Sequence, residues 1–112
     1  MAITIRDMVR AIQLECLEPL EPSRAAELLM RLSSLVGNCN DEIREADQAY
    51  AVHLLACLDT EAKANRAKIR AETSPEFARK RIARDTQALV VELIGSLKYL
   101  LKSKAEEMRL AR

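Results

Sequence analysis

Apolar positions recur every three or four residues along most of the chain, the spacing that places side chains on one face of an α-helix. The pattern predicts a first helix over residues 4–18, with Thr4 as its N-cap and Asp7 placed for a capping box. Pro19 and Pro22 end this helix, because a residue that precedes proline is biased out of helical geometry. Its apolar face consists of Ile5, Met8, Val9, Ile12, Cys16 and Leu17.

The same spacing continues over residues 23–72 and predicts a long second helix. The segment GNCND at 37–41 is ambiguous, since Gly37 and Asn38 suit a helix end and Asp41 suits a new N-cap. One glycine inside a helix costs only about 1 kcal/mol, and the apolar spacing runs through this segment. We therefore favour a single helix, with a break near 37–41 as the alternative.

The stretch KIRAETSPEFARKRIAR at 68–84 contains a helix stop followed by a helix start. Thr73 or Ser74 suits an N-cap, Pro75 suits the first helical position, and Glu76 complements the helix dipole. A connection this short predicts antiparallel neighbours, with the chain turning at 72–75 and a last helix over 75–110. The expected fold is a single all-α domain, 1–112: an antiparallel, coiled-coil-like hairpin of two long helices, preceded by shorter helical material.

The last predicted helix carries an apolar stripe that is wider than one neighbouring helix would cover. Such a stripe predicts a partner surface, with the first helix covering part of it and a second copy the rest. A homo-oligomer follows, and a dimer is the default because two-fold closure is the commonest symmetry. The predicted interface residues are Leu89, Val90, Leu93, Ile94, Leu97, Leu100 and Leu101.

Composition agrees with a helical domain. The 112 residues are 49% apolar and 31% charged, with 3% aromatic residues, two Gly and three Pro. No apolar run approaches the length of a membrane span, and acidic and basic residues come too early for a secretory signal. Cys16, Cys39 and Cys57 are odd in number and lack CxxC spacing, which favours a reducing cytoplasm. With a single histidine, His53, and no cysteine pair, we expect no Cys/His zinc site within one chain.

The net charge of +1 conceals an asymmetry between the two halves of the sequence. Residues 1–60 carry five basic and ten acidic side chains, whereas residues 61–112 carry thirteen and seven. This polarisation either serves a partner or lets the two halves attract each other within an oligomer.

Basic residues concentrate over 63–84, where they predict a nucleic-acid surface that would contact phosphates without reading sequence. Phe77 is the only aromatic residue nearby, so base stacking would contribute little. The competing interpretation is a solvated helix surface. The candidate phosphate-binding residues are Lys63, Arg66, Lys68, Arg70, Arg79, Lys80, Arg81 and Arg84.

The acidic residues at 41–47 suggest a magnesium site of the kind found in helical nucleotide hydrolases. Glu42 and Glu45 share a helix face, but the next acids, Asp59 and Glu61, are two apart and diverge around the helix. A solvated acidic surface is the simpler interpretation.

His53 and Cys57 lie four apart on one helix face, which is a possible base–nucleophile pair. A single straight helix supplies neither an oxyanion hole nor a phosphate-binding glycine loop, and none occurs elsewhere in the sequence. We therefore expect no enzymatic activity, cofactor or small-molecule substrate.

The C-terminal segment ELIGSLKYLLKSKAEEMRLAR, with AKANRAKIRAETSPEF before it, resembles the ends of small helical proteins encoded by bacteriophages and prophages. Such proteins often lie near recombination genes and have no defined activity. The resemblance implies a non-enzymatic helical interaction protein or, alternatively, an accessory nucleic-acid-binding protein that uses residues 63–84. It is carried by Ser96, Leu97, Lys98, Leu101, Lys102, Ser103, Glu106, Glu107, Met108 and Arg109.

Overall fold

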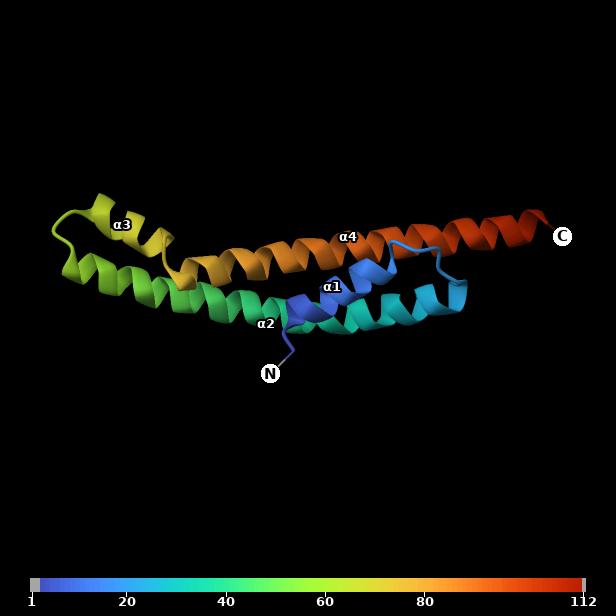
Figure 1. Cartoon of the computed structure of the whole chain (residues 1–112), viewed down its shortest axis with the longest axis horizontal. Helices are drawn as coiled ribbons and strands as arrows, with labels where there is room; N and C mark the ends of the chain where they lie inside the picture. The colour runs from blue at the N-terminus through green and yellow to red at the C-terminus, as the bar shows by residue number, and fades with distance from the viewer. Residues whose placement is uncertain (1–2, 112) are drawn as a thin grey trace.

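The computed structural model describes residues 3–111 and consists of four α-helices joined by short connections (Figure 1). Helix α1 spans Ile5–Glu15, α2 spans Pro22–Thr60, α3 spans Ala64–Glu72 and α4 spans Pro75–Leu110. The described residues contain no strand, which confirms the all-α class. The helices form a rod of 73 × 29 × 21 Å, and the C-terminal end of α4 extends beyond the start of α2 (Figure 1).

Helix α1 begins with the predicted capping box. The Thr4 hydroxyl accepts a hydrogen bond from the Asp7 backbone N–H at 3.1 Å, and the Asp7 carboxylate accepts one from the Thr4 N–H at 3.2 Å. The helix ends at Glu15, three residues before the predicted end, and Arg24 of α2 binds the Glu15 carboxylate at 2.6 and 2.9 Å. This ion pair spans the α1–α2 connection, and Val9 and Ile12 pack α1 against α2 and α4.

Helix α2 is continuous through Gly37, so the alternative of a break near 37–41 is wrong. Gly37 is exposed, and a Cβ added there would meet nothing within 4 Å. The cost of one exposed glycine is small compared with the apolar contacts that the helix makes on both sides of it.

The predicted helix over 23–72 does not exist as one element, because α2 ends at Thr60 and Glu61 is extended. Helix α3 then folds back along α2, buries Ala67 and Ala71, and so covers Cys57. Arg70 of α3 reaches the Thr60 hydroxyl at 3.4 Å and Glu61 at 3.3 Å. A straight helix would leave these small apolar side chains in water, which explains the reversal at a site without glycine or proline.

The predicted helix start at 74–75 is confirmed, but the chain does not reverse there. Ser74 accepts a hydrogen bond from the Phe77 N–H at 3.2 Å, and Pro75 occupies the first turn of α4. Helices α3 and α4 both run antiparallel to α2, so the hairpin turn lies at 61–63 and not at 72–75 (Figure 1).

The core comprises two clusters. The larger one joins α1, α2 and α4, and its buried members are Val9, Ile12, Ala25, Leu28, Leu32, Leu35, Cys39, Val90, Leu93 and Leu97. The smaller one lies under α3 and consists of Cys57, Ala67 and Ala71, with Tyr50 and Leu54 packed against it.

Candidate interaction surfaces

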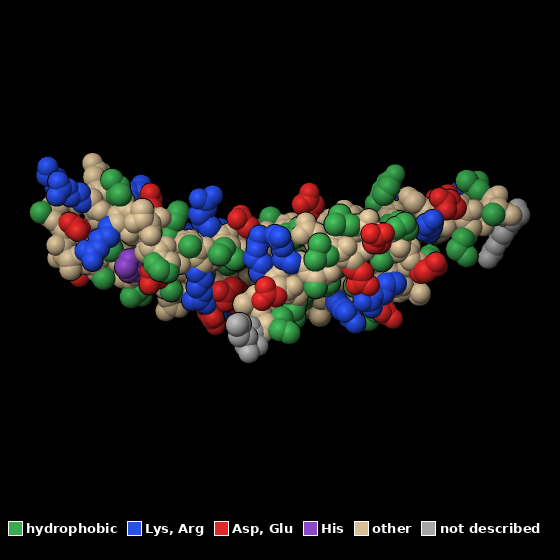
Figure 2. Space-filling model, in the orientation of Figure 1, with side chains coloured by type: hydrophobic (Ala, Val, Ile, Leu, Met, Phe, Trp, Pro, Cys, Tyr) green, Lys and Arg blue, Asp and Glu red, His purple; other side chains and the backbone are tan. Residues whose placement is uncertain are grey.

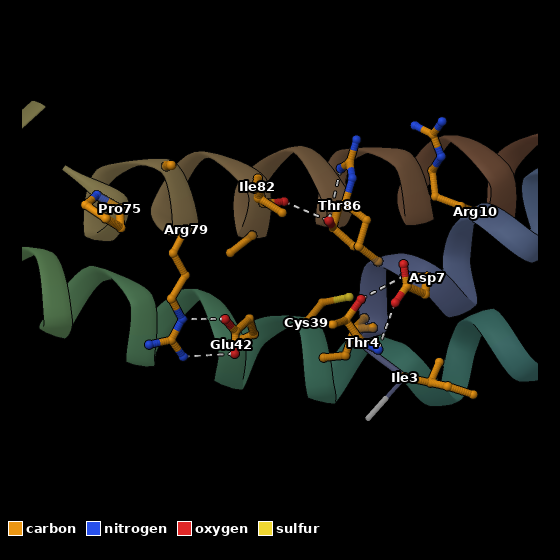
Figure 3. Close-up of a pocket in the computed structure, with 14 residues that line it drawn as sticks. Ile3, Thr4, Asp7, Arg10, Cys39, Glu42, Pro75, Arg79, Ile82 and Thr86 are labelled. Atoms are coloured by element: carbon orange, nitrogen blue, oxygen red, sulfur yellow. Dashed lines mark hydrogen bonds and ion pairs between the residues drawn. The ribbon is translucent and has the colours of Figure 1, made fainter. Parts of the chain in front are cut away.

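The acidic residues of α2 and two of the basic residues of α4 face each other across the hairpin. Arg79 Nε and Nη2 contact the two carboxylate oxygens of Glu42 at 2.8 and 3.1 Å (Figure 3), and Nη2 lies 3.6 Å from Glu45. Arg84 Nη2 binds Asp47 at 2.6 Å. We call these five residues the hairpin ion-pair cluster. Some of the excess acidic residues of the first half of the sequence therefore form ion pairs with basic residues of the second half in the same chain.

The bidentate contact changes the acidity of both partners. The hydrogen bonds from Arg79 lower the pKa of Glu42 below its ordinary value of 4.5, against the opposing effect of partial burial. The hydrogen bonds to Glu42 likewise raise the pKa of Arg79. Glu42 and Glu45, the two acids with the spacing of a magnesium site, therefore contact the Arg79 guanidinium. Within residues 3–111, no cluster of three potential metal-ligating side chains occurs.

The eight candidate phosphate-binding residues do not form one surface. Arg79 and Arg84 belong to the hairpin ion-pair cluster, and Arg70 holds the α2–α3 turn. Lys80 Nζ lies 4.6 Å from the centre of the Tyr50 ring, a cation–π contact. The remaining four are exposed and make no ion pair within the described part of the chain: Lys63, Arg66, Lys68 and Arg81.

Two of these four exposed basic residues, Arg66 and Lys68, lie on α3 at one end of the rod, and Lys63 is the N-cap of that helix. Over the rest of the visible face, Lys and Arg side chains alternate with Asp and Glu (Figure 2). Of the predicted basic surface, the exposed residues that lie close together in the structure are therefore Arg66 and Lys68 of α3 and its N-cap Lys63.

The apolar stripe of α4 is used largely within the chain. Val90, Leu93 and Leu97 are buried in the large core cluster. The other predicted interface residues are partly buried against the same cluster: Leu89, Ile94, Leu100 and Leu101. Helix α1 and the first half of α2 together cover the stripe, so its buried members cannot serve as an oligomer surface.

His53 and Cys57 are neighbours, as their spacing predicted. Cys57 Sγ lies 3.6 Å from His53 Nε2, and the same nitrogen lies 3.9 Å from Glu76 Oε2. The thiol belongs to the buried cluster under α3. A buried thiol cannot reach a substrate in solution, so this group packs the α2–α3–α4 junction.

A groove of about 810 Å³ opens where α1 begins, between α2 and α4 (Figure 3). Its wall includes Ile5, Ile82 and Cys39, and Thr86 lies at its base, where it donates to the Ile82 carbonyl and accepts from Arg6. Sequence reasoning missed this groove because no local pattern shows where α1 docks. The polar groups in its wall bind one another, apart from Arg10, and so present little that would orient a ligand.

The three cysteines are free thiols, and burial raises the pKa of Cys16 and Cys39.

Among the helices of residues 3–111, none combines the length and the apolar character that a membrane crossing requires.

Comparison with protein-family models, curated proteins and solved structures finds no significant match for this chain.

Proposed function

We propose that this chain is a non-enzymatic helical assembly protein, which packs its long helices against other helices and in the first place against a second copy of itself. One observation carries the proposal. Near its C-terminal end, helix α2 exposes the large apolar side chains Val52, Leu55 and Leu58, at 62%, 63% and 42%, and Met30, at 75%, is exposed in the N-terminal half of the same helix. Apolar side chains that gather on one helix face are typical of a protein contact.

The rest of the molecule supports this assignment. Glu42 and Asp47 are engaged in ion pairs with Arg79 and Arg84, and Cys57, the thiol beside His53, is buried. The free thiols support a reducing, cytoplasmic setting. The C-terminal resemblance supports an origin in a bacteriophage or prophage.

Sedimentation velocity tests the proposal directly. We expect the protein to sediment as a dimer at micromolar concentrations and to dissociate on dilution. A monomer over the whole micromolar range would overturn the assembly function.

Nucleic-acid binding is a second candidate, supported by Arg66 and Lys68 of α3 and its N-cap Lys63, which are exposed and make no ion pair with residues 3–111. These side chains would contact phosphates, and the affinity would fall steeply with salt because counterions are released. Arg79 is unsuitable as a test position, since its replacement would break the hairpin ion-pair cluster.

The test is fluorescence anisotropy with labelled single- and double-stranded DNA and RNA at low salt. The variant Lys63→Glu/Arg66→Glu/Lys68→Glu should abolish binding. As a control with similar charge change, Lys98→Glu/Lys102→Glu on α4 should reduce it only weakly. If the wild type does not bind, α3 is a solvated surface.

A further inference from the structure

The side of α2 that faces away from α4 carries an uninterrupted seam at alternating spacings of three and four residues. All ten positions are exposed, although two of them are leucines and one is methionine. The face is therefore free of α1, α3 and α4 over most of the length of α2. The seam consists of Glu27, Met30, Ser34, Gly37, Asp41, Arg44, Gln48, Ala51, Leu55 and Leu58.

We propose that this seam is the contact with a second copy of the chain, in which two α2 helices pack antiparallel about a two-fold axis between Glu42 and Ile43. The inference rests on the proposed assembly function and assigns it to one surface. In heptad terms the seam alternates a and d positions, with Asp41 at a and Arg44 at d. An antiparallel pair centred at this point places every a residue opposite a d residue of the second copy.

Charge complementarity selects this arrangement. Within one chain, Arg44 Nη2 lies 3.2 Å from Asp41, and the two side chains are 75% and 63% exposed. In the proposed dimer each Arg44 also faces Asp41 of the second copy, and the symmetry creates this contact twice. A parallel pair in register would instead place Asp41 against Asp41 and Arg44 against Arg44, which repel.

Side-chain size is also complementary in this register. Met30 lies opposite Leu55 of the second copy, Ser34 opposite Ala51, and Gly37 opposite Gln48. Gly37, Ser34 and Ala51 flank the central charged layers and let the helices approach closely, while Met30 and Leu55 meet toward the ends of the seam, where Leu58 lies opposite Glu27. The axis lies near the middle of α2, which spans Pro22–Thr60, so nearly the whole helix takes part in the contact.

The test is to reverse the charges of Asp41 and Arg44 and to measure the dimer dissociation constant by sedimentation equilibrium. Arg44→Glu and Asp41→Arg should each weaken the dimer at least tenfold, because each places like charges opposite one another. The double variant Asp41→Arg/Arg44→Glu should dimerise like the wild type. An equimolar mixture of the two single variants should also dimerise, because each chain then supplies the charge that the other lacks.

Lys98→Glu is the matched control, since it reverses a charge on exposed α4 and should leave the dimer unchanged. Circular dichroism confirms that each variant keeps its helices. A wild-type dimer that Arg44→Glu does not weaken would overturn the seam but leave the assembly function in place. A monomeric wild type would overturn both, and failure of the mixture to dimerise would overturn the antiparallel register.

Discussion

At the scale of single residues, the Glu42–Arg79 contact links positions that are 37 residues apart in the sequence. The two side chains are 34% and 44% exposed, so solvent screens the pair. Its contribution to the free energy of unfolding is therefore on the order of 1 kcal/mol or less. The lowered pKa of Glu42 makes that contribution depend on pH.

We expect Glu42→Gln to reduce stability near neutral pH and to lose its effect in acid. Because the folded-state pKa of Glu42 lies below the ordinary value of 4.5, the stabilisation is present above 4.5 and disappears as the pH falls through the lowered value. Urea unfolding of both proteins between neutral pH and acid measures the difference. Glu92→Gln, at an exposed position, is the control. An equal difference at all pH values would contradict this account.

At the scale of elements, α3 depends on small side chains rather than on its own helix propensity. It has nine residues, and its N-cap Lys63 makes no side-chain capping bond. Isolated helices this short are unstable in water, so its packing on α2 must hold it. Ala67 and Ala71, both 0% exposed, supply that packing.

Ala71→Asp should therefore detach α3 and leave the α2–α4 pair folded, because it buries an unpaired charge at the centre of the small cluster. Amide hydrogen exchange should show protection lost over residues 64–72 by at least tenfold, with protection kept in α4. Ala64→Asp, at an exposed position of the same helix, should change little. Loss of protection throughout the molecule would show that α3 and the large core unfold together.

At the scale of the whole molecule, the large core cluster is closed within one chain by α1, α2 and α4. Leu97 is 2% exposed in this cluster, whereas Val91, six residues earlier on the same helix, is 63% exposed. The stripe of α4 is consequently a determinant of monomer stability.

Leu97→Ala should lower the free energy of unfolding by about 2–5 kcal/mol, the range for a large-to-small change in a core. Val91→Ala should change it by about 0.5 kcal/mol or less. Urea unfolding measures both, and sedimentation of the folded variants measures association. If Leu97→Ala weakened the dimer without lowering stability, the stripe would be an intermolecular surface.

Local features of this protein could be predicted from the sequence alone. The caps at Thr4 and Ser74 and the proline at the start of α4 each depend on contacts within a few residues. The helical class follows from the same periodicity. Capping hydrogen bonds and helical side-chain spacing involve residues only three or four positions apart, so a sequence pattern is sufficient to predict them.

Three features were decided only by tertiary packing. The reversal at 61–63 exists because Ala67 and Ala71 gain burial on Cys57, although the helical period runs through the turn. Two of the candidate phosphate-binding residues pair with candidate magnesium ligands, Arg79 with Glu42 and Arg84 with Asp47, and each pair is separated by 37 residues. The α4 stripe is buried because α2 and α1 pack on it. Each outcome depends on which distant surfaces meet, and that is a property of the folded chain as a whole.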